Sequence, residues 1–423
     1  MWKKVLGTVG VRYFVAILNL ALIFINARML GVQGVGLVGI IVASINIVVV
    51  LNSILCGNTI VYFMNKYPMK VVFSSAYLWI PAGSTLACGV MYCLGLLPEG
   101  YVRDIFLLAL LNSLVAANTR LLLGKDKVKA FNLIFFLQSG LLFFILLYIY
   151  YVMESRSIGA YLGGMYIANI IALVVSGLLL IPLFRKEESK SSGPTFFTIF
   201  KEMFAYGLWS CADNLAETYT TRLNYFLLHN LSGLGSVGLL DAGTKISEGV
   251  WNISKSVSFI EYSEVAKESD KEKQKSITLR LFKFTVFATT SIMAVIMLVP
   301  EWIYTDYLFT SEFKGISHVI IALAPGIVAL GSHSILSHYF IASGKVRISA
   351  YSSFIGLAVL LIVGYILIPA YGVIGSAISS SIAFSSMLTF SIITFSIKTN
   401  TTPKEYLPTK EDVRSLLRLR KGN

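Results

Sequence analysis

The chain contains 423 residues, of which 56% are hydrophobic and 13% are charged, and its mean hydropathy is +0.74. Soluble domains carry about twice this share of charged residues, so the composition excludes a soluble globular protein. The formal net charge of +13 would suggest a nucleic-acid partner in a soluble chain, but in a membrane protein such a balance reports topology. The sequence therefore predicts an all-α polytopic membrane protein that does not bind nucleic acid.

Apolar segments separated by charged or Gly- and Pro-bearing breaks predict the transmembrane helices. One crossing with its loop takes about 35 residues, so the length fits about twelve crossings. In chain order, the predicted helices span residues 9–27, 36–60, 71–97, 104–123, 130–152, 158–184, 203–228, 237–260, 281–303, 316–341, 348–368 and 371–397. A linker with charge, Ser, Gly and Pro divides them six and six. The predicted domains are an N-terminal six-helix lobe (1–184), a cytoplasmic linker (185–202), a C-terminal six-helix lobe (203–397) and a basic cytoplasmic tail (398–423).

The distribution of Lys and Arg predicts the orientation. If the N-terminus is cytoplasmic, the inside segments carry 26 of the 35 basic residues and the outside segments carry 4. Because cytoplasmic loops are enriched in Lys and Arg, both termini are predicted to lie in the cytoplasm. The tail contains the sequence SLLRLRK, which fits a short helix on an anionic membrane surface or, as an alternative, a solvated segment.

The two halves of the chain resemble each other at equivalent places. Three pairs of matching segments follow in the same order: LGVQGVGLVG (30–39) with LSGLGSVGLL (231–240), GKDKVKAF (124–131) with GKVRISAY (344–351), and SIGAYLG (157–163) with VIGSAIS (373–379). A parallel six-helix repeat predicts two bundles with a cavity between them and transport by rocking. The alternative is that Gly-rich ends of apolar helices resemble each other by composition alone.

Ionisable residues inside a membrane are costly unless they face water or a partner, so they mark functional positions. The predicted helix 237–260 carries five polar residues at intervals of four and three: Asp241, Lys245, Glu248, Asn252 and Lys255. These intervals place all five on one face of a helix. We predict that this face lines water or forms ion pairs within the helix.

The predicted helix 203–228 carries Asp213 and Glu217 one turn apart, with Arg222 set apart from them. Two carboxylates on one buried face favour binding of a proton or a small cation, because like charges repel in a low dielectric. The candidates for ion coupling, with H+ or Na+ as the ion, are Asp213, Glu217, Asp241 and Glu248. A static salt-bridge network between the two helices is the alternative.

Arginine presents planar donors that bind phosphate oxygens in pairs, so arginines that face a cavity suit an anionic head group. The candidate contacts for such a substrate are Arg12, Arg28, Arg222, Lys245, Lys255 and Asn252. Snorkelling to the inner membrane boundary is the alternative for Arg12. Neither His333 and His338 nor the cysteines have the spacing of a metal site or a catalytic pair, and no Walker loop occurs. We therefore expect no cofactor, no metal site and no enzymatic activity.

Three segments carry a resemblance to a known family. FINARMLGVQGVGLVGI (24–40), SGLGSVGLLDAGTKI (232–246) and IPAYGVIGSAIS (368–379) resemble Wzx-type polysaccharide and O-antigen flippases of the multidrug/oligosaccharidyl-lipid/polysaccharide exporter (MOP) superfamily. This resemblance implies a MATE-like fold of two lobes. It also implies movement of polyprenyl-diphosphate-linked sugars from the cytoplasmic to the outer leaflet, coupled to an ion gradient.

The sequence thus predicts a flippase of the bacterial cytoplasmic (inner) membrane that moves a lipid-linked oligosaccharide for synthesis of O-antigen, capsule or exopolysaccharide. Its expected partners are this substrate, the coupling ion, membrane lipids, a polysaccharide polymerase and a chain-length regulator. A drug or cation antiporter of the same superfamily is the alternative. An antiporter should prefer a net acidic cavity, whereas the predicted helices contain five basic and four clear acidic residues.

Overall fold

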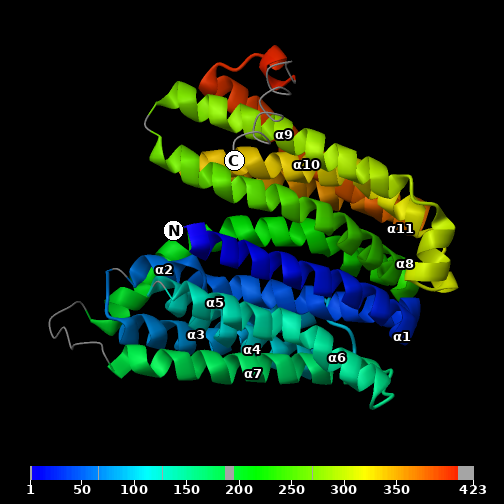
Figure 1. Ribbon diagram of the computed structural model, residues 1–423, viewed down its shortest axis with the longest axis horizontal. Helices are drawn as coiled ribbons and strands as arrows, with labels where there is room; N and C mark the ends of the chain where they lie inside the picture. Colours follow the sequence, from blue (N-terminus) through cyan, green and yellow to red (C-terminus); the bar gives the residue numbers. More distant parts are fainter. Residues whose placement is uncertain (1, 65, 126, 186–194, 269, 408–423) are drawn as a thin grey trace. The chain divides into compact units, whose positions relative to one another are not determined.

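The computed structural model describes the chain except residues 1, 65, 126, 186–194, 269 and 408–423. Within the described residues, the regular elements are all helical (Figure 1), as the composition predicts. In chain order, they are α1 (Trp2–Cys56), α2 (Asn58–Phe63), α3 (Met69–Cys93), α4 (Val102–Gly124), α5 (Val128–Phe135), η1 (Phe136–Gly140), α6 (Leu141–Tyr151), α7 (Ile158–Arg185), α8 (Phe196–Lys267), α9 (Lys271–Met297), η2 (Ile303–Leu308), η3 (Ser311–Phe313), α10 (Ile316–Ala342), α11 (Val346–Thr399) and η4 (Pro403–Tyr406).

The helices of the described residues are long and apolar enough for a multi-pass membrane protein. Eight segments meet this description, and two of them, Phe14–Phe63 and Arg347–Thr399, contain 50 and 53 residues. One crossing needs about 20 residues, so each of these two segments is long enough for two crossings. The total of twelve crossings and the cytoplasmic location of both termini stay predictions.

The three longest helices are interrupted by glycines. Gly31 breaks α1, Gly233 breaks α8 and Gly372 breaks α11, and each has a positive φ. Gly31 and Gly233 lie where the sequence predicts short connections between the first and second and between the seventh and eighth crossings. Gly372 lies two residues inside the predicted twelfth crossing (371–397), so that predicted boundary is displaced by two residues.

The chain forms two compact units. Unit 1 comprises Met1–Asp241 and Leu308–Glu312, and unit 2 comprises Ala242–Tyr307 and Phe313–Asn423. Their division lies inside α8. Half of the predicted linker (185–202), residues 186–194, lies outside the described residues, and the predicted domain bounds stay a prediction.

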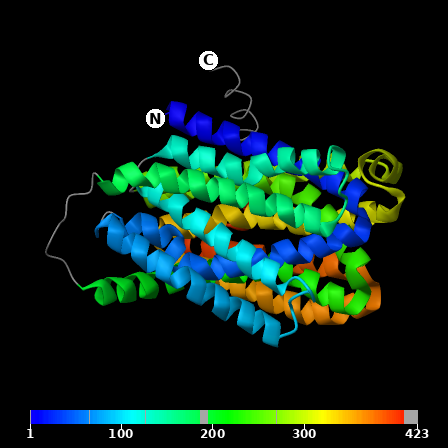
Figure 2. The ribbon, with the colours of Figure 1, turned by 90° about the horizontal axis from the view of Figure 1, so that it is seen from below.

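In unit 1, α4 packs against α1, α3 and α7, which run beside it in both ribbon views (Figures 1 and 2). Neutral amides join these helices. The Asn52 Nδ2 atom in α1 donates hydrogen bonds to the hydroxyls of Ser84 in α3 and Ser113 in α4, at 2.9 and 2.8 Å. In an apolar environment, such bonds hold helices together because no water competes for the polar groups.

In unit 2, α10 packs against α9 and α11 and is buried along most of its length. Two polar contacts hold it in place. The indole N–H of Trp251 in α8 donates to the Ser334 hydroxyl at 3.1 Å, and the Nδ1 atom of His333 lies 2.9 Å from the Ser391 hydroxyl of α11. His333 is therefore buried inside the unit.

Candidate transport seam

In unit 1, residues 32–67 pack against residues 196–241, and we call this contact the seam. The seam joins the second predicted crossing to the seventh and to the start of the eighth. Near its middle, the Cys211 thiol donates to the Val50 carbonyl oxygen at 3.1 Å. A Cβ on Gly207 would overlap the carbonyl oxygen of Ile54, so the two backbones touch there.

At one end of the seam, which we call the glycine end, the two predicted repeats have the same backbone. Gly31 has φ 68° and ψ 177°, and Gly233 has φ 78° and ψ 176°. The two residues occupy equivalent positions in the matching segments 30–39 and 231–240. This conformation is open to glycine and strained for other residues. The two matching segments therefore share a backbone conformation at this glycine, whereas the six-helix repeat stays a prediction.

The glycine end is also a reciprocal contact. A Cβ on Gly36 would overlap the Leu234 carbonyl oxygen, and a Cβ on Gly238 would overlap the Val32 carbonyl oxygen. In the repeat, Gly36 is equivalent to Gly238, and Val32 is equivalent to Leu234. Each copy thus presses its glycine against the same position of the other, as in a self-complementary two-fold interface. Small residues permit this close approach of two membrane helices.

A segment distant in the sequence also reaches the glycine end. The Glu312 carboxylate accepts a hydrogen bond from the backbone N–H of Val32 at 2.8 Å. This N–H follows the Gly31 break and begins a helix, where a negative charge is favourable. Phe309 packs edge-on against Phe24 of α1, with ring centroids 5.2 Å apart.

The opposite end of the seam, which we call the basic end, is closed by side chains. The Glu202 Oε2 atom lies 3.0 Å from Lys66 Nζ and accepts a hydrogen bond of 2.7 Å from the Tyr67 hydroxyl. Tyr206 stacks on Tyr62, with ring centroids 4.7 Å apart. The hydrogen bond from Tyr67, and then that from Lys66, hold the pKa of Glu202 below its ordinary range.

Between the two ends, α8 presents polar side chains. Thr220, Asn224 and Asp241 are buried. The Arg222 guanidinium donates to the Tyr225 hydroxyl at 3.0 Å and lies 5.5 Å from the centre of that ring. Asp241 lies against Gly39 of α1, where an added Cβ would stand 3.1 Å from its carboxyl carbon. Of these polar residues of α8, Asp241 lies directly against α1.

The polar face of α8 continues into unit 2. From Gly233 onward α8 is helical to Lys267, so the five residues from Asp241 to Lys255 share one helix face, as predicted. The Lys255 ammonium stands 3.4 Å from the ring centre of Trp251, a cation–π contact. Trp251 is held in turn by Ser334 of α10. This arrangement positions a cation on an aromatic platform.

The predicted site residues fall in different surroundings. Those described in unit 1 are Arg28, which is exposed, Glu217 and Arg222, which are half-buried, and Asp241, which is buried. Those in unit 2 are Lys245, Glu248 and Lys255, which are half-buried, and Asn252, which is exposed. The side chains of Arg12 and Asp213 lie outside what the structure describes. Binding by any of these ten residues stays a prediction.

Sequence reasoning missed the groups that close the seam. Lys66, Tyr67 and Glu202 lie in predicted loops, and Glu312 lies between the ninth and tenth predicted crossings. A search limited to ionisable residues inside the predicted crossings cannot find these four residues.

The contact of Trp251 with Lys255 had a weak signal in the sequence, because residues four apart on a helix are neighbours. Among the described residues, no cluster of three or more His, Cys, Asp or Glu is arranged to hold a metal ion.

A family comparison covers most of the chain. The family described as polysaccharide biosynthesis protein matches residues 25–318, a stretch that includes the whole seam. The chain belongs to this family. A search of curated proteins found no match to the chain.

Solved structures share the fold at low sequence identity. A structure named lipid II flippase MurJ, inward closed conformation, is 17% identical, with a TM-score of 0.71 over 98% of this chain and 91% of that chain. An inward-facing multidrug resistance MATE family transporter of the MOP superfamily is 16% identical, with a TM-score of 0.70 over 91% and 94% of the two chains. A MOP superfamily transporter from Pyrococcus furiosus is 16% identical, with a TM-score of 0.57 over 94% of each chain. The MATE-like MOP fold expected from the sequence is confirmed.

Proposed function

We propose that the protein is a flippase that moves a polyprenyl-diphosphate-linked oligosaccharide across the bacterial cytoplasmic membrane for synthesis of a surface polysaccharide. Membership of the polysaccharide biosynthesis family supports this role. The composition adds to it, because the chain consists of apolar helices and short connections. A polymer made from lipid-linked units needs a step that carries each polar head across the apolar membrane core.

The observation that carries the proposal is the seam, which has a different closure at each end and the buried Asp241 of α8 against Gly39 of α1. A route for a polar substrate through a membrane must be lined by polar groups, because lipid cannot solvate them. Alternating access also needs two closures that open separately. The backbone contact of Gly36 and Gly238 and the ion pair of Lys66 and Glu202 are separate in this sense.

Basic residues along the route suit a diphosphate. We propose that the positively charged candidates contact the diphosphate, with Asn252 near the sugar: Arg12, Arg28, Arg222, Lys245 and Lys255. The cation–π contact with Trp251 orients the Lys255 ammonium group without neutralising its positive charge. The acidic candidates Asp213, Glu217, Asp241 and Glu248 pair with these cations or bind H+ or Na+ during the cycle.

The test is deletion of the gene in a strain that is making the polymer, with mass spectrometry of undecaprenyl-diphosphate-linked oligosaccharide and an assay of surface polysaccharide. We expect completed lipid-linked units to accumulate and surface polymer to be lost. Leaflet-specific labelling should find these units on the cytoplasmic side, since failed polymerisation would leave them on the outer side. Normal surface polymer without accumulation would contradict the proposal.

Complementation tests the cationic face of α8. The Lys245→Ala/Lys255→Ala variant should fail to restore flipping. The control variant Lys125→Ala/Lys127→Ala changes the same charge at two exposed lysines of a predicted loop and should restore it. Full activity of the first variant in a correctly inserted protein would remove these two lysines from the substrate route.

The second candidate function is a drug or cation antiporter. The buried Asp241 carboxylate favours it, because a buried acid binds cations. Efflux assays with cationic dyes in the deletion strain separate the two functions. Dye accumulation with normal surface polymer would support the antiporter and reject the flippase.

A further inference from the structure

In unit 2, α8 has a second polar side, opposite the face that runs from Asp241 to Lys255. On this side the described residues include four buried polar ones at intervals of seven, four and three: Ser247, Ser254, Ser258 and Glu261. At about 3.6 residues per turn, these intervals place all four on one side of the helix, turned away from Lys245 and Lys255. This side of α8 therefore ends in a buried carboxyl group.

The second polar side packs against α9 and α10. A Cβ added to Gly331 of α10 would overlap the Ser254 hydroxyl of α8 and stand 3.4 Å from the methyl group of Thr289 of α9. The three helices therefore meet at this point. On α9, Thr278 and Thr285 are buried like Thr289 and share its side of the helix by their spacing. The contact of α8 with α9 is thus lined by hydroxyl groups.

Glu261 lies at the apolar end of this contact. Val257 and Val265, one turn before and one turn after it on α8, pack in a cluster with Phe282 of α9 and Tyr339 of α10. The exposed fraction of Glu261 is 0%, so its side chain points into the contact between the three helices and not into solvent.

The Glu261 carboxyl group lacks the partners that a buried charge needs. Neither of its oxygens has a hydrogen bond of ordinary geometry, although the Thr278 hydroxyl lies near them. Among the described residues, no cation forms an ion pair with Glu261. On α10, the Nδ1 atom of His338 lies 2.7 Å from the Ser334 carbonyl oxygen of its own helix.

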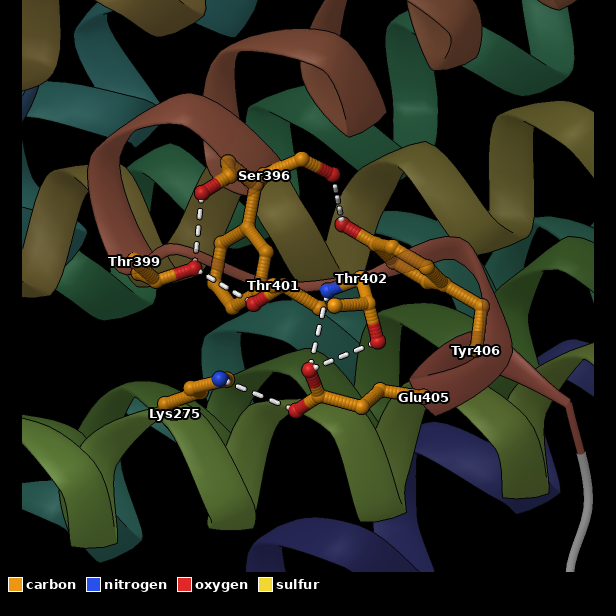
Figure 3. Close-up of polar contacts among 8 residues, drawn as sticks. Lys275, Ser396, Thr399, Thr401, Thr402, Glu405 and Tyr406 are labelled. Carbon is orange, nitrogen blue, oxygen red and sulfur yellow. Dashed lines mark hydrogen bonds and ion pairs between the residues drawn. The ribbon is translucent and has the colours of Figure 1, made fainter.

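The lysine that α9 carries near this contact is bound to another carboxylate. Figure 3 shows that η4 is fastened across α9, and we call this contact the strap: the Glu405 carboxylate lies 2.9 Å from Lys275 Nζ and accepts a hydrogen bond of 2.8 Å from the Thr402 backbone N–H. Tyr406 of the strap packs edge-on against Phe282 of α9, with ring centroids 5.5 Å apart. The charge of Lys275 is therefore neutralised outside the contact of α8 with α9.

We propose that Glu261 is a proton-binding site, occupied while α8 packs against α9 and α10. A carboxylate that has lost its water and gained no cation is much less stable than the neutral acid, so a proton is the ligand that this position favours. Separation of the helices would admit water to the carboxyl group and release the proton. The site is distinct from the acidic candidates of the transport route. It does not rest on the proposed function, because proton binding is measured without transport.

The test is infrared spectroscopy of the full-length protein, purified in a neutral detergent without substrate, because the stretching band of a protonated carboxyl group differs from that of a carboxylate. At about pH 7, well above the ordinary glutamate pKa of about 4.3, we expect an acid band in the parent protein that Glu261→Gln lacks. The control Glu264→Gln removes an exposed carboxyl group one turn further along α8 and should retain the band. If Glu261→Gln does not fold, Glu261→Met, which is similar in length and uncharged, replaces it.

The melting temperature provides a second measurement. Burial raises the pKa of the Glu261 carboxyl group well above its ordinary value, so the folded protein keeps this proton at pH values where the unfolded chain has released it. A rise in pH through this range should therefore lower the melting temperature of the parent more than that of Glu261→Gln.

Two results would overturn the proposal. The same acid band in the parent and in Glu261→Gln, with equal pH dependence of the melting temperature, would show that Glu261 is ionised in the folded protein. Loss of the parent's acid band on addition of Na+ at constant pH and ionic strength would assign the carboxyl group to a metal cation and not to a proton.

Discussion

The two ends of the seam are closed by different means. At the glycine end, Gly36 and Gly238 bring backbone against backbone, so nothing can be inserted and no rotamer change opens the contact. At the basic end, the solvent-exposed side chains of Lys66 and Glu202 form an ion pair, and the half-buried Tyr67 donates a hydrogen bond to Glu202. Packed backbones separate as rigid bodies, whereas exposed ion pairs break and form readily. We infer that the basic end opens easily. We also infer that separation of the two backbones at the glycine end limits opening of the seam at that end.

The largest effect is expected from a side chain at the glycine end. Gly36→Leu must push the Leu234 carbonyl oxygen away, and overpacking of this kind costs about 1–3 kcal/mol. We expect loss of flipping and a lower melting temperature in detergent, because the reciprocal contact cannot form. Gly177→Ala in α7 is the control, since an added Cβ there meets no atom within 4 Å. Normal flipping by Gly36→Leu would show that this contact is dispensable.

An intermediate effect is expected at the basic end. Glu202→Gln removes the charge that binds Lys66 while keeping a side chain of the same shape, so the protein should fold but populate the open form a few-fold more. Accessibility of Cys211, which is buried in the seam, to a water-soluble maleimide reports this opening, in a background in which Cys56, Cys88 and Cys93 are replaced. The exchange variant Lys66→Glu/Glu202→Lys should restore protection. If it does not, the attraction between these charges is not what closes this end.

The same ion pair predicts a pH dependence. The pKa of Glu202 is lowered in the closed form, so its contribution to closure is present above the ordinary pKa of glutamate and is lost as the pH falls through the lowered value. Because only the thiolate reacts with maleimide, each rate is divided by the rate of the denatured protein at the same pH. Acidification should raise this ratio for Cys211 in the parent protein. Glu202→Gln has no carboxyl group to titrate at this position, so its ratio should stay constant over this range. Equal pH profiles would contradict the assignment.

The smallest effect is expected at the strap between α9 and η4. Hydrogen bonds from Thr402 and Lys275 lower the pKa of Glu405 to about 2. Above the ordinary range of glutamate the strap is complete, and it is lost as the pH falls toward that value. At neutral pH, Glu405→Gln should speed proteolysis of the tail with little change in flipping. Unchanged proteolysis would show that the packing of Tyr406 alone holds η4.

Features that rest on backbone geometry could be predicted from the sequence. Gly31 and Gly233 occupy equivalent positions in the matching segments, and both have φ values that favour glycine. The similarity of the two backbones is therefore visible in the sequence. The polar face of α8 was predicted for a similar reason. Residues that follow one another at intervals of four and three lie on the same face of a continuous helix.

Contacts between residues distant in the chain could not be predicted in this way. Nothing in the sequence joins Lys66 to Glu202, or Glu312 to the backbone of Val32, because these pairs exist only once the chain has folded. The hydrogen bonds of Asn52 were missed for another reason. Neutral amides are compatible with apolar helices and do not stand out in a search for charges.

The most direct test of the seam is to lock its basic end. With the native cysteines replaced, Lys66→Cys/Glu202→Cys joined by a short, cleavable bismaleimide should stop flipping of lipid-linked oligosaccharide. Cleavage of the linker should restore it, and the same reagent should leave each single-cysteine variant active. Full flipping by a completely cross-linked protein would contradict the account, because the substrate would then cross without opening this end.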